Sequence, residues 1–282
     1  MKKLFYLSFA FILTATVGFG QSKDVRQVDF FNAIHSSGSW DVFIKKGSSE
    51  KVVIEAESGP IEKIETEVED NTLKIRIENG SWSDAFRGSF TNNFKNVKIY
   101  VTFTELGEIT GSGSGTIRLE SPINSEDVMI RSSGSGNFYA ESSIKANDDM
   151  RIVNSGSSTI KFLASVTAGD ETEITNSGSG DIEFDSFYAD ELEINNSGSG
   201  NIEIEGGEIN SQSIRLSGSG NMKMEDLKSK ECEIRKSGSG NVYVSVTEIL
   251  RGSSSGSGNV YVKNGRPRLD LNFSGSGKVK YL

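Results

Sequence analysis

The stretch that decides the fold is NSGSGNIE at Asn196–Glu203, because the chain repeats this phrase along most of its length. Close copies are NSGSGDIE at 176–183 and KSGSGNVY at 236–243. The phrase begins at nine places, 18 to 22 residues apart: Ser112, Ser133, Ser155, Ser177, Ser197, Ser217, Ser237, Ser255 and Ser274. A repeat of this length predicts short structural units that stack on one another.

The residues that flank each copy alternate between apolar and polar. Apolar residues stand three positions before the phrase, and five and seven positions after its first serine. Around Ser197 these residues are Ile194, Ile202 and Ile204, and the polar Glu203 lies between the last two. Alternation with a period of two predicts strands with one buried face, and the helical period of 3.6 is absent. Nine copies in step also argue against disorder.

We therefore expect an all-β protein built as a parallel β-solenoid, with one repeat in each coil. Residues 111–282 would form about nine coils, stacked about 4.8 Å apart into a rod about 40 Å long. Residues 21–110 are rich in alternating segments but lack the period, so we expect an irregular cap and opening coils there. Within them HSSGSWDVFI (35–44) is a degenerate copy, and 79–93 is a polar loop. Residues 21–282 are expected to form one continuous domain.

The residues of the phrase also predict the local shape of the backbone. If the backbone stays extended, its glycines face inward and its serines face outward. Inward glycine lets the backbone bend sharply or press close to the opposite wall, and outward serines can form hydrogen-bonded ladders between coils. The next residue is often asparagine, as at Asn201, and asparagine tolerates left-handed turn geometry. The structural glycines predicted in this way are Gly113, Gly134, Gly156, Gly178, Gly198, Gly218, Gly238, Gly256 and Gly275.

The first residues, MKKLFYLSFAFILTATVGFG, predict export. Two lysines precede an apolar run and small residues near Gly20, which is the layout of a secretory signal peptide at 1–20. We expect the mature protein in the periplasm, on the outer cell surface or secreted. No later segment is apolar enough to span a membrane, so no transmembrane segment is expected in the mature chain.

The net charge restricts the class of binding partner, and the cysteine content restricts how the fold can be stabilised. Loss of Lys2 and Lys3 with the signal peptide moves the formal charge from −9 to −11. Such an acidic chain is a poor partner for nucleic acid, which needs clustered lysine and arginine. A single cysteine, Cys232, excludes an intramolecular disulfide framework, and its place in an apolar column predicts a buried thiol.

The chain resembles the putative auto-transporter adhesin, head GIN domain family of secreted bacterial proteins. The resemblance is carried by VDFFNAIHSSGSWDVFIKKG (28–47), by VKIYVTFTELGEITGSGSGTI (97–117) and by the SGSGN copies that follow. It covers nearly all of 24–282, and it implies a right-handed parallel β-helix that is exported to the periplasm or cell surface. The family offers no catalytic residues to carry over. The sequence ends soon after its last copy of the phrase, so we expect no self-transporting membrane barrel.

Few residues suggest catalysis. His35 is the only histidine, so a serine-histidine site would have to use it. The sequence GSSSG at 252–256 fits the pattern of a nucleophile elbow, but no helix follows it. Glu183 and Glu203 occupy the same column in adjacent coils, and paired carboxylates are what glycoside cleavage needs. The flanking Lys161 and Lys223 instead predict a self-neutralising outer face.

The remaining candidates concern binding. Acidic runs at 65–70 and 147–149 could hold calcium but lack the spacing of a recognised loop. Tyr139, Tyr243 and Tyr261 share the outward column of Glu183 and Glu203, so these five residues form the candidate face for a glycan or a cell-surface protein. Packing of the tyrosines between coils is the simpler interpretation. Trp40 and Trp82 are expected in the core or cap.

The leading prediction is a non-catalytic, adhesin-like surface or cell-envelope module with no cofactor. The alternative is a β-helix protein that binds or cleaves carbohydrate. A third hypothesis, an ice-binding or self-assembling surface, is weakened because the ladder residue is serine instead of threonine.

Overall fold

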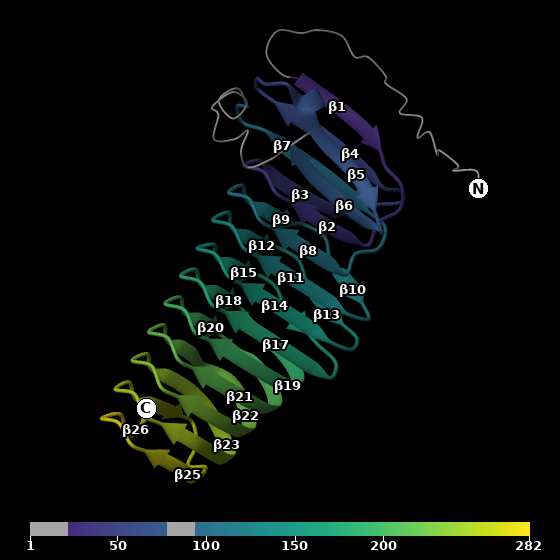
Figure 1. Ribbon diagram of the computed structural model, residues 1–282. Coiled ribbons are helices and arrows are strands. Elements are labelled where there is room, and N and C mark those ends of the chain that lie inside the picture. Colours follow the sequence, from purple (N-terminus) through teal and green to yellow (C-terminus); the bar gives the residue numbers. More distant parts are fainter. Residues whose placement is uncertain (1–21, 78–93) are drawn as a thin grey trace, which may run out of the picture.

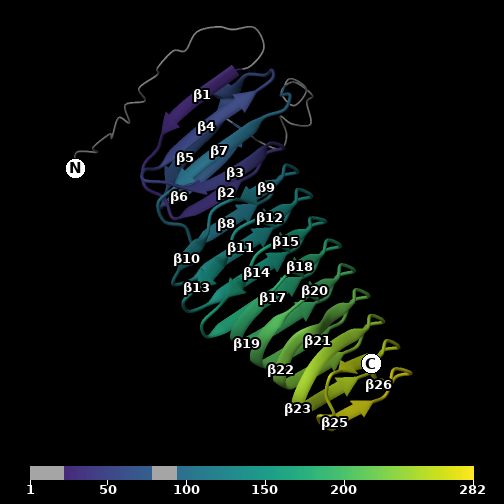
Figure 2. The same ribbon diagram turned by 180° about the vertical axis from the view of Figure 1, so that it is seen from behind.

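The computed structural model describes residues 22–77 and 94–282. The predicted signal peptide, the loop at 79–93 and Trp82 therefore lie outside the described residues. The described chain is almost entirely β-structure, and its coils stack into an elongated solenoid, as predicted (Figure 1, Figure 2). The first coils and the cap lie at one end of the rod and the last coil at the other.

Each coil passes through three walls before the phrase returns the chain to the start of the next coil. The first wall contains β3 (Asp41–Lys46), β9 (Ile117–Leu119), β12 (Phe138–Ala140), β15 (Ile160–Phe162), β18 (Ile182–Phe184), β20 (Ile202–Ile204), β24 (Val260–Lys263) and β26 (Val279–Tyr281). The second wall contains β10 (Ile123–Ser125), β13 (Ile144–Ala146) and β16 (Val166–Thr167).

The third wall ends each coil at the phrase. It contains β2 (Ala33–Ser36), β8 (Glu108–Gly111), β11 (Val128–Ser132), β14 (Met150–Asn154), β17 (Glu171–Asn176) and β25 (Arg268–Phe273). Toward the C-terminal end the strands merge around the corners. The strands that span two or three walls are β19 (Phe187–Asn196), β21 (Gly207–Leu216), β22 (Met222–Lys236) and β23 (Val242–Ser254).

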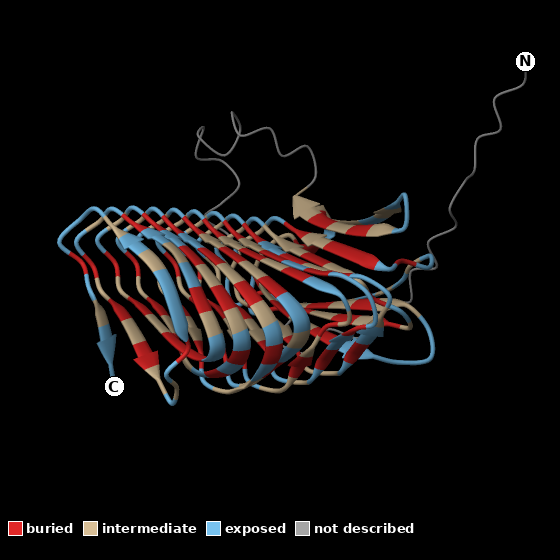
Figure 3. Cartoon of the chain, turned by 90° about the horizontal axis from the view of Figure 1, so that it is seen from below, coloured by how far each residue is buried: buried red, intermediate tan, exposed pale blue. Residues whose placement is uncertain are grey.

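Neighbouring coils pair in parallel and keep the predicted register. In the third wall Ile174 pairs with Ile194, which in turn pairs with Ile214. In the first wall Ile182 pairs with Ile202, and Ile202 pairs with Met222. These columns are buried, and the outward positions between them are not (Figure 3). The apolar columns run from coil to coil, with Gly252 as an interruption after Ile234 in the third wall, and the buried residues form one cluster.

A β-rich cap closes the N-terminal end, where antiparallel pairing replaces the parallel stack. Its elements are β1 (Ser22–Gln27), β4 (Lys51–Ala56), η1 (Ile61–Lys63), β5 (Ile64–Glu69), β6 (Thr72–Ile77) and β7 (Lys98–Phe103). Strands β1, β4 and β7 pair antiparallel in that order, and β5 pairs antiparallel with β6. Strands β6 and β7 then continue in parallel onto β2 and β3.

The degenerate copy at 35–44 forms an opening coil, as the sequence predicted. Its two strands, β2 and β3, pair in parallel with β8 and β9 of the following coil. Trp40 is buried at this level, and its indole Nε1 donates a hydrogen bond of 3.0 Å to Ser36 Oγ. The phrase therefore already directs the fold before the regular repeats begin.

The glycines of the phrase are required by a contact between coils. A Cβ on Gly198 would lie 1.9 Å from the carbonyl oxygen of Gly178, and a Cβ on Gly200 would lie 1.9 Å from that of Gly180. Gly200 is buried, but Gly198 is half-buried. A side chain therefore has no room at these positions, and the group it would meet is the backbone of the preceding coil, not the opposite wall.

The serines of the phrase are exposed, as predicted, but their side chains do not form the expected ladder. Ser197 and Ser199 face solvent, and backbone hydrogen bonds join this coil to the one before it, such as Ser199 N–H to Gly178 O at 3.1 Å. Within residues 112–282, no hydrogen bond joins exposed serine hydroxyls of the phrase between coils. The hydroxyls that face solvent are therefore left for other partners.

Side-chain amides form the ladder instead. The Oδ1 of Asn201 accepts the backbone N–H of Asn221 at 2.9 Å, and Asn221 Oδ1 accepts that of Asn241 at 2.9 Å. Asn201 and its equivalents do not adopt the left-handed geometry that asparagine tolerates. The described non-glycine residues with positive φ are Asp70, Asn71, Asn96 and Asn264. Asparagine is used here because its amide can join one coil to the next, whereas the turn itself is made by glycine.

A second, buried column of polar residues lies just before the phrase, and the sequence analysis missed it. Asn196 donates through Nδ2 to Gly200 O at 2.8 Å and accepts from Gly198 N–H at 3.1 Å, so its amide bridges the turn from inside. Asn176 and Asn154 make the same donation to residues four positions later. The full column is Ser36, Gly111, Ser132, Asn154, Asn176, Asn196, Leu216, Lys236, Ser254 and Phe273.

Lys236 is the charged member of this column. The residue is only 3% exposed, and its Nζ donates one hydrogen bond, to Gly238 O at 2.9 Å. Burial lowers the pKa of the Lys236 ammonium below its ordinary value. No carboxylate is paired with it among the described residues, so the fold carries an uncompensated cation at this level.

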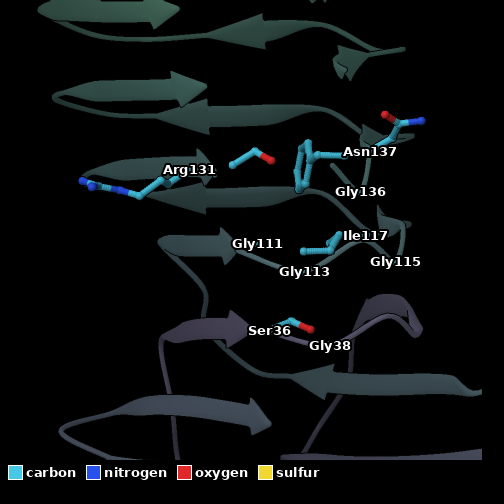
Figure 4. A pocket seen from close by; sticks show the side chains of 11 residues that line it. Ser36, Gly38, Gly111, Gly113, Gly115, Ile117, Arg131, Gly136 and Asn137 are labelled. Atoms are coloured by element: carbon cyan, nitrogen blue, oxygen red, sulfur yellow. The ribbon is translucent and has the colours of Figure 1, made fainter. Parts of the chain in front are cut away.

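A small cavity marks the level at which the column has no side chain. It lies beside Gly111, has a volume of about 10 Å³ and is lined by Ser36, Ser132 and the edges of Ile117 and Phe138 (Figure 4). This volume corresponds to about one water molecule. The cavity is therefore a consequence of packing and is too small for an organic ligand.

We predict that Gly198→Val and Gly218→Val each lower the free energy of unfolding by about 3 kcal/mol, because a backbone carbonyl cannot move away without separating two coils. The matched changes Ser199→Ala and Ser219→Ala should alter it by less than about 1 kcal/mol. Thermal unfolding followed by circular dichroism measures both. Valine variants that melt like the wild type would contradict the contact between coils.

We predict that Lys236→Leu stabilises the protein by about 1 kcal/mol at neutral pH, because it removes a buried charge at a position where Leu216 already fits. The folded pKa of Lys236 lies below 10.5, so the cost is fully present at neutral pH. It disappears as the pH rises through the folded pKa toward 10.5. The advantage of the variant in urea unfolding should therefore shrink in alkaline buffer, and an advantage independent of pH would count against this explanation.

Candidate partner-binding surfaces

The candidate face predicted from sequence is one continuous column on the outside of the first wall. Strand pairing places its side chains in register, one for each coil, with no gap in the series. The column consists of Phe43, Arg118, Tyr139, Lys161, Glu183, Glu203, Lys223, Tyr243, Tyr261 and Lys280. The structure therefore brings the five candidate residues onto one face, with the tyrosines on either side of the charged segment.

The two glutamates are each paired with a lysine. Lys161 Nζ lies 2.7 Å from a carboxylate oxygen of Glu183, and Lys223 Nζ lies 3.0 Å from one of Glu203. These hydrogen bonds raise the pKa of both lysines. Carboxylates engaged in this way are unlike the free acid and base that glycoside cleavage uses. The segment is a charge-neutral strip on a partly exposed surface.

The tyrosines pack along the rod. The rings of Tyr243 and Tyr261 are stacked, with centroids 4.5 Å apart and planes 6° from parallel. The Lys280 ammonium lies 5.5 Å from the centre of the Tyr261 ring, and the Arg118 guanidinium lies 4.8 Å from that of Tyr139. These contacts cover ring faces, so a partner would meet mainly ring edges and hydroxyl groups.

His35 does have a serine neighbour, which sequence alone could not show. Its Nε2 lies 3.2 Å from Ser112 Oγ, on adjacent coils of the third wall. Burial lowers the pKa of His35, and the nearby Glu108 opposes this effect. The Glu108 carboxylate accepts a hydrogen bond from Thr110 Oγ1 at 3.2 Å, and no described side chain hydrogen bonds to His35 Nδ1. The pair therefore lacks the orienting group of a catalytic triad.

The structure also shows where the other residues considered for catalysis or metal binding lie. Ser254, the central serine of GSSSG, is buried at the end of β23. Cys232 is buried in the predicted column, and burial raises the pKa of its thiol, as expected for a structural cysteine. Repulsion from Asp149 and other nearby acids raises the pKa of Asp148. Across 22–77 and 94–282, no group of three or more histidine, cysteine, aspartate or glutamate residues is arranged to hold a metal.

A groove that sequence analysis did not predict runs beside the phrase on the third-wall side. It has a volume of about 350 Å³ and crosses three adjacent coils. We call it the ridge groove, and its lining is Asn195, Asn196, Ser197, Arg215, Leu216, Ser217, Arg235 and Ser237. The sequence does contain a signal for this groove: Arg215 and Arg235 lie one repeat apart, each two residues before a copy of the phrase.

The fold defines the class of protein: a parallel β-solenoid with small residues at one edge and a regular outer surface. The chain belongs to the family described as putative auto-transporter adhesin, head GIN domain, whose model matches residues 30–168 and 149–267. The resemblance seen in the sequence is therefore confirmed. Membership supports an adhesin-like or binding role and an extracellular or surface setting.

Solved structures share the fold over nearly the whole chain. A putative adhesin from Parabacteroides distasonis has a TM-score of 0.70 and 21% identity, and the alignment covers 94% of this chain and 98% of that one. A putative adhesin from Parabacteroides merdae has a TM-score of 0.67 and 19% identity, with coverage of 94% and 97%. A putative lipid binding protein from P. distasonis has a TM-score of 0.65 and 24% identity, with coverage of 94% and 97%.

The search of curated proteins found no match. Among the described residues, no helix has the length and apolar character needed to cross a membrane.

We predict that the free energy of unfolding depends on pH through the titration of His35. Its folded pKa lies below 6.5, so the folded protein binds a proton less readily than the unfolded chain. Stability is then full above pH 6.5, falls as the pH drops from 6.5 to the folded pKa, and levels off below it. His35→Asn should remove this step, measured as the difference between the two proteins in urea unfolding at a series of pH values. Parallel profiles for the two proteins would contradict it.

Proposed function

We propose that this protein is a non-catalytic, exported binding module of the adhesin type, which presents the outer column of its first wall to a partner. The observation that carries the proposal is the unbroken, in-register column from Arg118 to Lys280 on a rigid stack of coils. A surface of this kind presents one polar or aromatic side chain at each coil in a regular row, which suits an extended partner on a cell surface.

The contacts available on this face favour recognition over chemistry. Tyr139, Tyr243 and Tyr261 offer ring edges and hydroxyls, and Glu183 and Glu203 offer the outer lone pairs of paired carboxylates. These groups hydrogen bond to hydroxyl and amide groups alike, so the partner would be a glycan or a cell-surface protein. The signal peptide predicted at 1–20 supports export to the periplasm, the outer surface or the medium.

The test is binding of the purified, fluorescently labelled mature chain to bacterial and host cells. A variant with Tyr243→Ser, Tyr261→Ser, Glu183→Gln and Glu203→Gln should bind about tenfold more weakly, because it alters four of the five candidate contact residues. Circular dichroism checks that this variant is folded.

A matched control removes the same charge from the third wall of this part of the solenoid, through Glu171→Gln and Glu191→Gln, which pair with each other in register. The control should bind as the wild type does. Equal binding by all three proteins would exclude the first wall as the partner face. Release of oligosaccharide from a glycan by the wild type, abolished in Glu183→Gln or Glu203→Gln, would overturn the non-catalytic assignment.

A further inference from the structure

The ridge groove is built from the same pair of positions in three successive coils. Strand register stacks Asn195, Arg215 and Arg235 along one side of it. The first serines of the phrase, Ser197, Ser217 and Ser237, form the other side, and all three are exposed. The groove therefore runs along the stacking direction and offers one long polar side chain and one hydroxyl at each step of about 4.8 Å.

Many hydrogen-bond donors in this groove are not used by the protein itself. Arg215 contacts Glu193 and Asn195 through Nη1, and Arg235 contacts Glu233 through Nη2 at 2.8 Å. A guanidinium has five N–H donors in a planar fork, so most donors of both arginines are available. The three serine hydroxyls make no side-chain hydrogen bond within residues 94–282. Adjacent guanidinium groups with free donors match the geometry of carboxylate and sulfate groups.

The local charge also differs from that of the whole chain. The lining of the groove contains two arginines, Arg215 and Arg235, and no carboxylate. Each arginine pairs with a glutamate of its neighbourhood outside the lining, Arg215 with Glu193 and Arg235 with Glu233. Glu233 is shared by Arg235 and Arg251, and Lys236 has no acidic partner in the described chain. On a chain with a formal charge of −9, a groove lined by two arginines without an acidic side chain is a local exception. At physiological salt, repulsion from acids more than about 8 Å away is largely screened.

We propose that the ridge groove binds an acidic glycan, a linear chain of sugars that carry carboxylate or sulfate groups. The arginines would hold the acidic groups and the serines would hydrogen bond to sugar hydroxyls. A linear polymer fits because the groove repeats the same contacts over three coils, whereas a single small anion would need only one of the two arginines. A folded protein would need a contact surface of about 800 Å², far wider than a groove one side chain across.

This proposal goes beyond the proposed function, because it adds a second binding site on the other side of the phrase from the first-wall face. Binding of the mature chain is measured by titration calorimetry with three probes at physiological salt: oligogalacturonate, sulfated dextran oligosaccharide and neutral dextran oligosaccharide. Wild type should bind at least one acidic probe and should bind the neutral probe about tenfold more weakly or not at all.

The deciding variant is Arg215→Gln with Arg235→Gln, and its control is Arg131→Gln with Arg268→Gln, which removes the same charge from third-wall strands outside the groove. The groove variant should bind the acidic probe about tenfold more weakly, and the control should remain within about twofold of wild type. Ser217→Ala should cause a smaller loss. Circular dichroism confirms that each variant is folded.

Three results would overturn the proposal. Equal losses in the groove variant and the control would mean that attraction is non-specific, and equal affinity for acidic and neutral probes would mean that charge is not recognised. Binding of phosphatidylglycerol vesicles without binding of either acidic oligosaccharide would assign the groove to lipid headgroups. The two sites are tested separately, because the cell-binding assay with the first-wall variant bears on the proposed function and calorimetry with the groove variant bears on the groove.

Discussion

The structure depends on the contact between the backbone of each phrase and the backbone of the phrase before it. The carbonyl oxygen of Gly178 occupies the space in which a Cβ of Gly198 would lie, and the same relation recurs from coil to coil. Only glycine permits this approach, so the edge of the solenoid becomes a thin, continuous ridge. The serines are thereby held outward, and the ridge groove exists because the chain turns so sharply beside the third wall.

A ridge made of bare backbone must satisfy its own polar groups, and two sets of amides do so. Asn196 and its equivalents bond the phrase from inside the coil, while Asn201 and its equivalents join one coil to the next. Backbone groups that lack partners in a buried setting are costly, so these side chains complete what the glycine contact begins. Leu216 and Lys236 interrupt the inner series, and both lie beside the groove.

Sequence predicted the features that arise from periodicity, and it failed where function depends on what adjacent coils do to each other. The apolar columns, the parallel stack and the buried Cys232 all follow from alternation with a fixed repeat. The direction of the excluded Cβ at Gly198 did not follow, because alternation distinguishes inside from outside but not the direction along the rod. The geometry of Asn201 was mistaken for a turn preference, since its partner lies a whole repeat away. The ridge groove could not be predicted either, because the sequence pattern does not show that Arg215 and Ser217 lie beside a groove.

The repeats differ in length by several residues, yet the phrase and the strands beside it keep their register. The differences are absorbed on the far side of the coil, where the pairing of β22 with β23 shifts between Met224 and Lys228 and again between Ser229 and Glu231. Insertions and deletions thus have a preferred location, remote from the ridge. Single coils can therefore gain or lose residues there, while the phrases remain evenly spaced along the solenoid.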